Sequence, residues 1–175
     1  MREIDEKDGD RIVKEVGFGI AGEEAAALIE CGVKIIDVGG TGGTNFIAIE
    51  SLRRKSSLLK KFESWGIPTP ISLIEVLRAA EGRADVIASG GLKDGFDAAK
   101  AIALGAKAAA YAGSFLHILL NKGPSSLEKH ILHIEKEIKY IMAMTGARNL
   151  AELRKRPVII KGETYHWVKC REIST

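Results

Sequence analysis

The sequence predicts an α/β fold in which four parallel strands alternate with helices. Short apolar segments at residues 11–16, 33–38, 85–89 and 108–112 are typical of strands buried in a parallel sheet. Alanine-rich segments at residues 22–31 and 96–104 follow two of these strands and have the composition of amphipathic helices. Glycine comes directly after each predicted strand, and glycine is frequent overall, at 19 of 175 residues. This alternation predicts strand–helix units on a parallel sheet with a ligand-binding edge at the carboxyl ends of the strands.

Further helices are expected between the second and third strands and after the fourth. A basic helix is predicted over residues 48–63 and a second helix over 71–80, separated by a turn at 65–70. Another helix is expected to begin after residue 112, followed by a long amphipathic helix over 127–144 and a short one over 149–154. Residues 157–160 are predicted to be extended, and residues 162–168 close the chain.

The length limits how much of a barrel the chain can form. Four strand–helix units occupy roughly residues 11–120, whereas a complete eight-unit barrel needs about 250 residues. We therefore predict half of a TIM-type (β/α)8 barrel plus C-terminal helices over residues 11–175, preceded by a charged tail at 1–10; a small open sheet is the alternative. A half-barrel leaves two strand edges unpaired and one sheet face uncovered, which predicts an oligomer or a fragment whose other half is missing.

Composition excludes several classes of protein. Apolar residues make up 46% and charged residues 28%, without the uninterrupted apolar run that a transmembrane helix needs. Residues 1–10 lack the apolar centre of a signal peptide. A net charge of +3 does not favour nucleic acid as a partner, and two cysteines cannot form a disulfide scaffold, so a reducing cytoplasm is expected.

Two glycine-rich segments follow predicted strands. Residues 89–95 (SGGLKDG) place consecutive backbone N–H groups and Lys93 at the end of the third strand, and residues 112–114 (AGS) end the fourth strand before a helix. The loops after the last two strands of α/β barrels often bind phosphate, so we predict a phosphate site; ordinary turns with a surface lysine are the alternative. Residues 39–46 (GGTGGTNF) match neither a dinucleotide fingerprint nor a P-loop, and predict either close backbone approach to a ligand or a flexible loop. Thr44 and Asn45 would then supply hydrogen-bonding side chains.

Charged residues also lie within the strands. Lys14 in the first strand either faces water beside Glu15 or points into the barrel mouth, where it would stabilise an anionic ligand. Asp37, at the end of the second strand, either orients a ligand or caps a turn. His130 and His133 lie three residues apart, and without a third ligand nearby we interpret them as surface residues.

Six segments in order closely resemble the C-terminal half of type 2 isopentenyl-diphosphate isomerase. They are residues 13–19 (VKEVGFG), 39–46 (GGTGGTNF), 65–69 (WGIPT), 88–95 (ASGGLKDG), 144–147 (MTGA) and 161–165 (KGETY). The resemblance extends from about residue 11 to about residue 168, and the set is far more specific than any one string.

The resemblance implies an FMN-bound barrel enzyme that works as a homo-oligomer. Such an enzyme interconverts isopentenyl and dimethylallyl diphosphate with reduced FMN, Mg²⁺ and NAD(P)H. The resemblance further implies that Lys14 lies near the flavin pyrimidine edge and that Gly39 and Thr44 contact FMN. It implies that the FMN phosphate is cradled by Gly91, Leu92, Lys93, Ala112 and Gly113. The family has arginine at the position of Lys93, and lysine keeps the charge but loses the bidentate geometry.

The same resemblance implies that the catalytic and Mg²⁺-binding residues belong to an N-terminal half. No catalytic residue and no metal ligand are therefore assigned in this chain, and the roles of Arg53, Arg54 and Trp65 stay open. We expect the chain alone to lack isomerase activity and to bind FMN weakly or not at all.

Two alternatives remain. An FMN-dependent α-hydroxy-acid oxidase or dehydrogenase would also have the phosphate loop, but it would have a base histidine after the second of these strands, and residues 39–46 hold none. A non-catalytic half-barrel that serves as an assembly module is the other.

Overall fold

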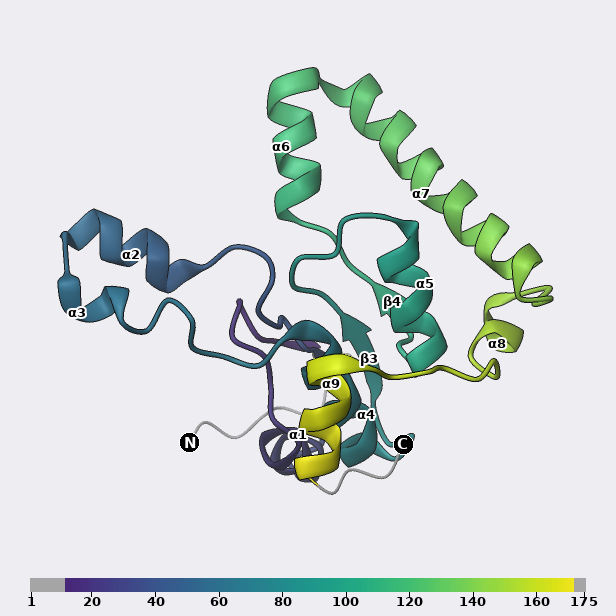
Figure 1. Cartoon of the computed structure of the whole chain (residues 1–175), viewed down its shortest axis with the longest axis horizontal. Coiled ribbons are helices and arrows are strands. Elements are labelled where there is room, and N and C mark those ends of the chain that lie inside the picture. Colours follow the sequence, from purple (N-terminus) through teal and green to yellow (C-terminus); the bar gives the residue numbers. More distant parts are fainter. Residues whose placement is uncertain (1–11, 172–175) are drawn as a thin grey trace.

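The computed structural model describes residues 12–171 and has a four-stranded parallel sheet at its centre (Figure 1). The strands follow one another in chain order: β1 (Ile12–Lys14), β2 (Ile35–Asp37), β3 (Asp85–Ala88) and β4 (Ala108–Ala109). The predicted α/β fold with four parallel strands is confirmed, although β4 ends earlier than residue 112. The predicted tail at residues 1–10, and residue 11, lie outside the described residues.

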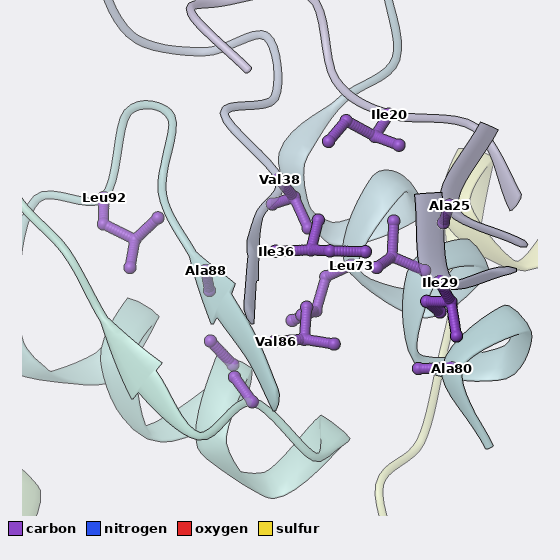
Figure 2. Packing of buried hydrophobic residues seen from close by; sticks show 13 residues of the cluster. Ile20, Ala25, Ile29, Ile36, Val38, Leu73, Ala80, Val86, Ala88 and Leu92 are labelled. Carbon is purple, nitrogen blue, oxygen red and sulfur yellow. The ribbon is translucent and has the colours of Figure 1, made fainter. Parts of the chain in front are cut away.

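Helices cover one face of the sheet. Side chains of α1 (Gly22–Glu30), α4 (Thr69–Ala80) and α5 (Gly95–Leu104) pack against the strands in one apolar cluster. Figure 2 shows Ile36 and Val86 at its centre, with Leu73 of α4 and Ile29 of α1 beside them. The periodicity of two along a strand places Ile36 and Val86 at the same register on this covered face.

The other face, which we call the open face, carries the alternate residues. Register pairs Ile12 with Ile35, and Lys14 with Asp37 and Ile87. Ile12 is 57% exposed, whereas Ile36 on the covered face is fully buried. Among residues 12–171 all the helices that contribute to the central core lie on the covered side, so the open face has the single-layer character predicted for a half-barrel.

The predicted basic helix over residues 48–63 is wrong in its continuity. The segment forms α2 (Phe46–Arg54) and the short α3 (Ser57–Lys60), which together extend away from the sheet as the α2–α3 arm (Figure 1). The break lies at Lys55, whose backbone is left-handed with φ of 50°, and at Ser56, whose hydroxyl accepts a hydrogen bond from the Leu59 N–H. A side-chain cap within the basic stretch therefore starts a new helix.

Two helices rise beside β4, and a small second core lies beneath them. Helix α6 (Gly113–Lys122) leads into α7 (Pro124–Met144), and α7 packs against α5 (Figure 1). Ile102 of α5 and Leu153 of α8 (Leu150–Leu153) belong to the second cluster. Residues 157–160 cross from α8 to the last helix without pairing as a strand. None of the helices within residues 12–171 has the length and apolar character needed to cross a bilayer.

The last helix, α9 (Gly162–Cys170), is held by a buried carboxylate of α4. Glu75 is 2% exposed and accepts hydrogen bonds from the Trp167 indole N–H at 2.7 Å and from the Gly22 backbone N–H at 2.9 Å. Arg171 contacts Glu75 at 3.3 Å and forms an ion pair with Glu23 of α1. One buried charge thus joins α1, α4 and the end of the described chain.

Candidate functional site: an anion-binding strand edge

Glycines bring the loops after β2 and β3 together at the carboxyl edge of the sheet. A Cβ at Gly90 would overlap the Gly40 carbonyl oxygen, and a Cβ at Gly91 would overlap that of Gly42. A Cβ at Gly43 would lie 2.8 Å from the Gly91 nitrogen, which is also too close. Close backbone approach was predicted for this segment, and the partner that the structure provides is the chain's own backbone.

The loop after β2 also reaches the end of β4. The Thr44 hydroxyl oxygen would lie 3.6 Å from a Cβ at Gly113, so Thr44 and the start of α6 are neighbours. The predicted site residues Gly39, Thr44, Gly91 and Gly113 therefore belong to three loops that meet at one edge of the sheet.

The N-terminus of α6 presents unpaired donors at this edge. Its N-cap is Ala112, which supplies no side-chain cap, and within the described residues the backbone N–H groups of Gly113, Ser114 and Phe115 have no hydrogen-bond acceptor. The Ser114 hydroxyl is buried and also lacks a partner within residues 12–171. Free N–H groups at the start of a helix, together with an unsatisfied buried hydroxyl, are typical of a site for an anion.

The loop after β3 adds donors next to α6. Within the described chain the backbone N–H groups of Gly91 and Leu92 have no acceptor, and the Lys93 side chain is exposed without an ion-pair partner. The Lys93 backbone N–H, by contrast, donates to Asp97 at 3.1 Å. Lys93 can therefore contribute its ammonium group to the site, and its backbone is already used.

Helix α5, which follows this loop, is closed to anions. The Asp94 side chain caps the Asp97 N–H at 3.0 Å, and Glu137 of α7 accepts from the Gly95 N–H at 2.6 Å. Burial, together with Asp97, Asp94 and Glu137, raises the pKa of Tyr111 to about 12. This negative surrounding leaves α6, rather than α5, as the helix whose N-terminus is open to an anion.

The strand ends also carry a charged group. The Lys14 ammonium lies 2.8 Å from Asp37 Oδ2 and 2.9 Å from the Ser89 hydroxyl, so β1, β2 and β3 each contribute one side chain. Lys14 pairs with Asp37 rather than with Glu15, which accepts from the backbone N–H groups of Gly17 and Phe18, but its side chain is 50% exposed and so still reaches water. Asp37 accepts from the Gly39 N–H at 3.2 Å, which fits the turn cap considered for it, and its role toward a ligand stays a prediction.

Asn45 does not face the site. Its side chain caps α2 by accepting from the Ala48 N–H at 2.9 Å, and its amide donates to the Glu63 carbonyl at 2.6 Å. This residue was expected to be available to a ligand together with Thr44, but its hydrogen bonds hold the two ends of the α2–α3 arm together.

Arg53 and Arg54 of the α2–α3 arm both pair with Glu50 of the same helix, and not with residues at the carboxyl edge of the sheet. Arg53 and Arg54 both contact Glu50, with Arg53 at 2.7 Å, and Arg53 holds the pKa of Glu50 at about 2. Trp65 is 68% exposed and packs edge-on against Phe62, so it is not a core residue within the described chain, and its role stays open.

Two contributors to the site were not singled out in the sequence. The sequence does not distinguish Ser114 from the other serines. Only the structure does so, because its hydroxyl is buried at the start of α6, where no side chain caps the helix. Ser89 was part of the glycine-rich segment, but its contacts with Lys14 and Asp37 come from strands far away in the chain. No group of three or more potential metal ligands gathers among residues 12–171.

The parallel α/β fold with helix and loop N–H groups gathered at its carboxyl edge defines a candidate phosphate-binding protein. The chain belongs to the FMN-dependent dehydrogenase family, whose model matches residues 4–160. Within that family the similar curated proteins are isopentenyl-diphosphate delta-isomerases. The one from Bacillus licheniformis is 48% identical over 161 residues, which cover 92% of this chain and 46% of that protein. The one from Moorella thermoacetica is 45% identical, again over 92% of this chain and 46% of that protein.

The chain therefore spans about half the length of the curated relatives it matches, and the resemblance to the C-terminal half of such an isomerase is confirmed. Solved structures with the same fold include a mandelate oxidase with an FMN adduct, with a TM-score of 0.65 at 19% identity over 89% of this chain and 43% of that one. A lactate oxidase from Pediococcus acidilactici has a TM-score of 0.66 at 22% identity over 87% of this chain and 37% of that one.

Proposed function

We propose that this chain is the FMN-phosphate-binding half of an isopentenyl-diphosphate/dimethylallyl-diphosphate isomerase. The observation that carries the proposal is that the loop after β2 approaches both the uncapped N-terminus of α6, with its buried Ser114 hydroxyl, and the loop after β3, where the N–H groups of Gly91 and Leu92 have no acceptor within residues 12–171. A phosphate monoester supplies the acceptor oxygens that these donors lack.

The residues present fit FMN. Gly91, Leu92, Ala112 and Gly113 would hold its phosphate through backbone groups, with Lys93 adding a positive charge. A Cβ at Gly91 would overlap the Gly42 carbonyl, so the loops after β2 and β3 pack backbone against backbone beside these donors.

The ring would lie nearer the sheet. Lys14 would donate to its pyrimidine edge, while Gly39 and Thr44 would contact the cofactor from the loop after β2. When bound, the flavin supplies an electron-rich ring whose reduced form carries negative charge, and a hydrogen bond donated by the Lys14 ammonium would stabilise that charge.

The remaining parts of the proposal concern the whole enzyme. Its catalytic residues, its Mg²⁺ ligands and most of the diphosphate-binding groups would come from an N-terminal half, with NAD(P)H as the source of electrons for the flavin. We further propose a cytoplasmic homo-oligomer without nucleic-acid or membrane partners. An α-hydroxy-acid oxidase function is less well supported, because the oxidases share the fold at 19–22% identity whereas the isomerases share nearly half of the aligned residues.

The phosphate assignment can be tested by NMR titration of the isotope-labelled chain with FMN, and with riboflavin as the control ligand that lacks the phosphate. FMN is expected to shift the amide signals of Gly91, Leu92, Gly113 and Ser114 saturably, even at millimolar affinity, and riboflavin is expected to leave them nearly unchanged.

Matched variants sharpen this test. Lys93→Ala should weaken FMN binding about tenfold, the value of one charge-assisted contact, whereas Lys100→Ala, which removes an exposed lysine within α5, should have no effect. Equal shifts with riboflavin, or none with either ligand, would refute the phosphate site and favour a pure assembly module.

A further inference from the structure

The Lys14 ammonium is held by two partners before any ligand is present. It donates to Asp37 Oδ2 at 2.8 Å and to the Ser89 hydroxyl at 2.9 Å, and these partners lie on the two strands next to its own. An ammonium group has three donors, so one N–H is left over. The Lys14 side chain is 50% exposed and lies on the open face, which leaves that third donor accessible.

The Asp37 side chain is buried, and both of its carboxylate oxygens accept hydrogen bonds. Its side chain is 7% exposed, Oδ2 accepts from Lys14, and Oδ1 accepts from the Ser89 hydroxyl and from the Gly39 N–H. A carboxylate so enclosed has a fixed orientation, because each of its oxygens has a partner from a different strand or loop. The ammonium that it holds is therefore fixed as well.

The pair is electrically neutral, and this limits what Lys14 can contribute. The charge of Asp37 offsets that of Lys14 at 2.8 Å, so the group presents little net charge to a ligand. Instead, the Lys14 ammonium offers the ligand one N–H donor in a defined direction.

Ser89 connects this group to the phosphate loop. Its carbonyl accepts from the Gly40 N–H at 3.0 Å and from the Thr69 hydroxyl at 3.2 Å, and the next residues in the chain are Gly90 and Gly91. A displacement of the Lys14 ammonium and its partner Ser89 would therefore also move the loop after β3, which carries the proposed anion-binding N–H groups.

We propose that Asp37 and Ser89 are positioning residues, which preset the Lys14 ammonium so that its third N–H meets an acceptor atom of the flavin ring. The proposal rests on the proposed function for the identity of the ligand. The preset geometry itself is a property of the chain without ligand.

The geometry is tested first on the ligand-free chain with ¹⁵N-labelled lysine. The Lys14 ammonium protons are expected to exchange slowly with water and to show a correlation across the hydrogen bond to the Asp37 carboxyl carbon. Asp37→Asn removes the charge at nearly constant shape, and Ser89→Ala removes the hydroxyl. Each should speed the exchange by about tenfold or more.

The matched control is Asp85→Asn. Asp85 also lies on the open-face register and pairs with Lys107 at 3.1 Å, but that pair is exposed and lies at the amino end of β3, away from the carboxyl ends of the strands. The variant should leave the Lys14 signal unchanged. Fast exchange of the Lys14 protons in the wild type, with a folded chain by amide spectra, would overturn the proposal.

The role toward the ligand is tested by a double-mutant cycle with FMN. Asp37→Asn should weaken FMN binding about tenfold when Lys14 is present and much less in a Lys14→Met background, because Asp37 acts through the ammonium. Saturation with FMN should shift the Lys14 ammonium signal in the wild type but not in Asp37→Asn. Equal losses in both backgrounds, or an unmoved signal at saturation, would overturn the positioning role.

The two hypotheses fail separately. If FMN does not bind the wild-type chain, the proposed function is refuted for the isolated chain and the flavin role of Asp37 falls with it, while the ligand-free exchange measurement still decides whether the ammonium is preset.

Discussion

Tyr111 reports the negative surrounding at the start of α5. Its hydroxyl donates to the Asp94 carbonyl at 2.7 Å, its ring stacks on Phe115 with centroids 5.0 Å apart, and its pKa is raised to about 12. The protonated form is therefore favoured by folding. The resulting stability is fully present below the unfolded pKa of about 10 and is lost as pH rises from there through about 12.

Urea unfolding at a series of pH values is expected to show this loss above pH 10. Tyr111→Phe should remove much of the dependence, whereas the exposed Tyr140→Phe should retain it. A Tyr111→Phe chain with the wild-type pH dependence would contradict the assignment.

Elements differ in how far their sequence predicts them. Local sequence patterns predict the four strands and the helices α1, α4, α5 and α7, because each segment contains its own apolar residues and the glycine or turn residues that end it. The α2–α3 break does not, since it depends on Ser56 capping a new helix within a continuous basic stretch. The site divides in the same way: its glycines were visible in the sequence, but the Lys14–Asp37–Ser89 contacts join residues separated by 23 and 75 positions.

The attachment of α9 depends on one indole hydrogen bond. Trp167→Phe keeps the apolar ring but leaves the buried Glu75 carboxylate with one donor fewer, which should cost about 1.5–3 kcal/mol of unfolding free energy. Thermal and urea denaturation measure the loss, and amide exchange should show it first in α9. Tyr165→Phe, on the exposed side of the same helix, is the control. An unchanged exchange rate in α9 would show that Glu75 does not hold it.

On the scale of the whole molecule, the open face and the outer edge of β1 lack partners among residues 12–171. Within this described part of the chain no strand pairs with that edge, and no helix of the central core covers that face. A groove of 720 Å³ runs along that edge between β1, α1 and Trp65, and Ile12 and Val16 are more than half exposed. We expect the isolated chain to self-associate through this apolar surface.

Light scattering should therefore give a mass of at least two chains. Ile12→Lys should shift the chain toward the monomer, whereas Leu120→Lys, at a more exposed apolar position on α6, should not. A monomer at all concentrations would show that the edge is protected without a partner.

The chain alone is expected to lack isomerase activity, because the proposed catalytic and Mg²⁺-binding groups belong to the other half. An assay with isopentenyl diphosphate, FMN, a reductant and Mg²⁺ tests this, and turnover at ordinary enzymatic rates would contradict it.

The packing of glycine against glycine between the loops after β2 and β3 affects how mutational surveys of this edge should be interpreted. Substitution of Gly90 or Gly91 would wedge these two loops apart, and a Cβ at Gly40 would overlap Thr69 at the start of α4, whether or not a cofactor ever enters, so intolerance there is no signature of ligand contact. Gly113 is different, because a methyl group at that position meets nothing closer than 3.6 Å. Sensitivity to alanine at Gly113, in a chain that still folds, would carry information about the cofactor that the more crowded glycines cannot give.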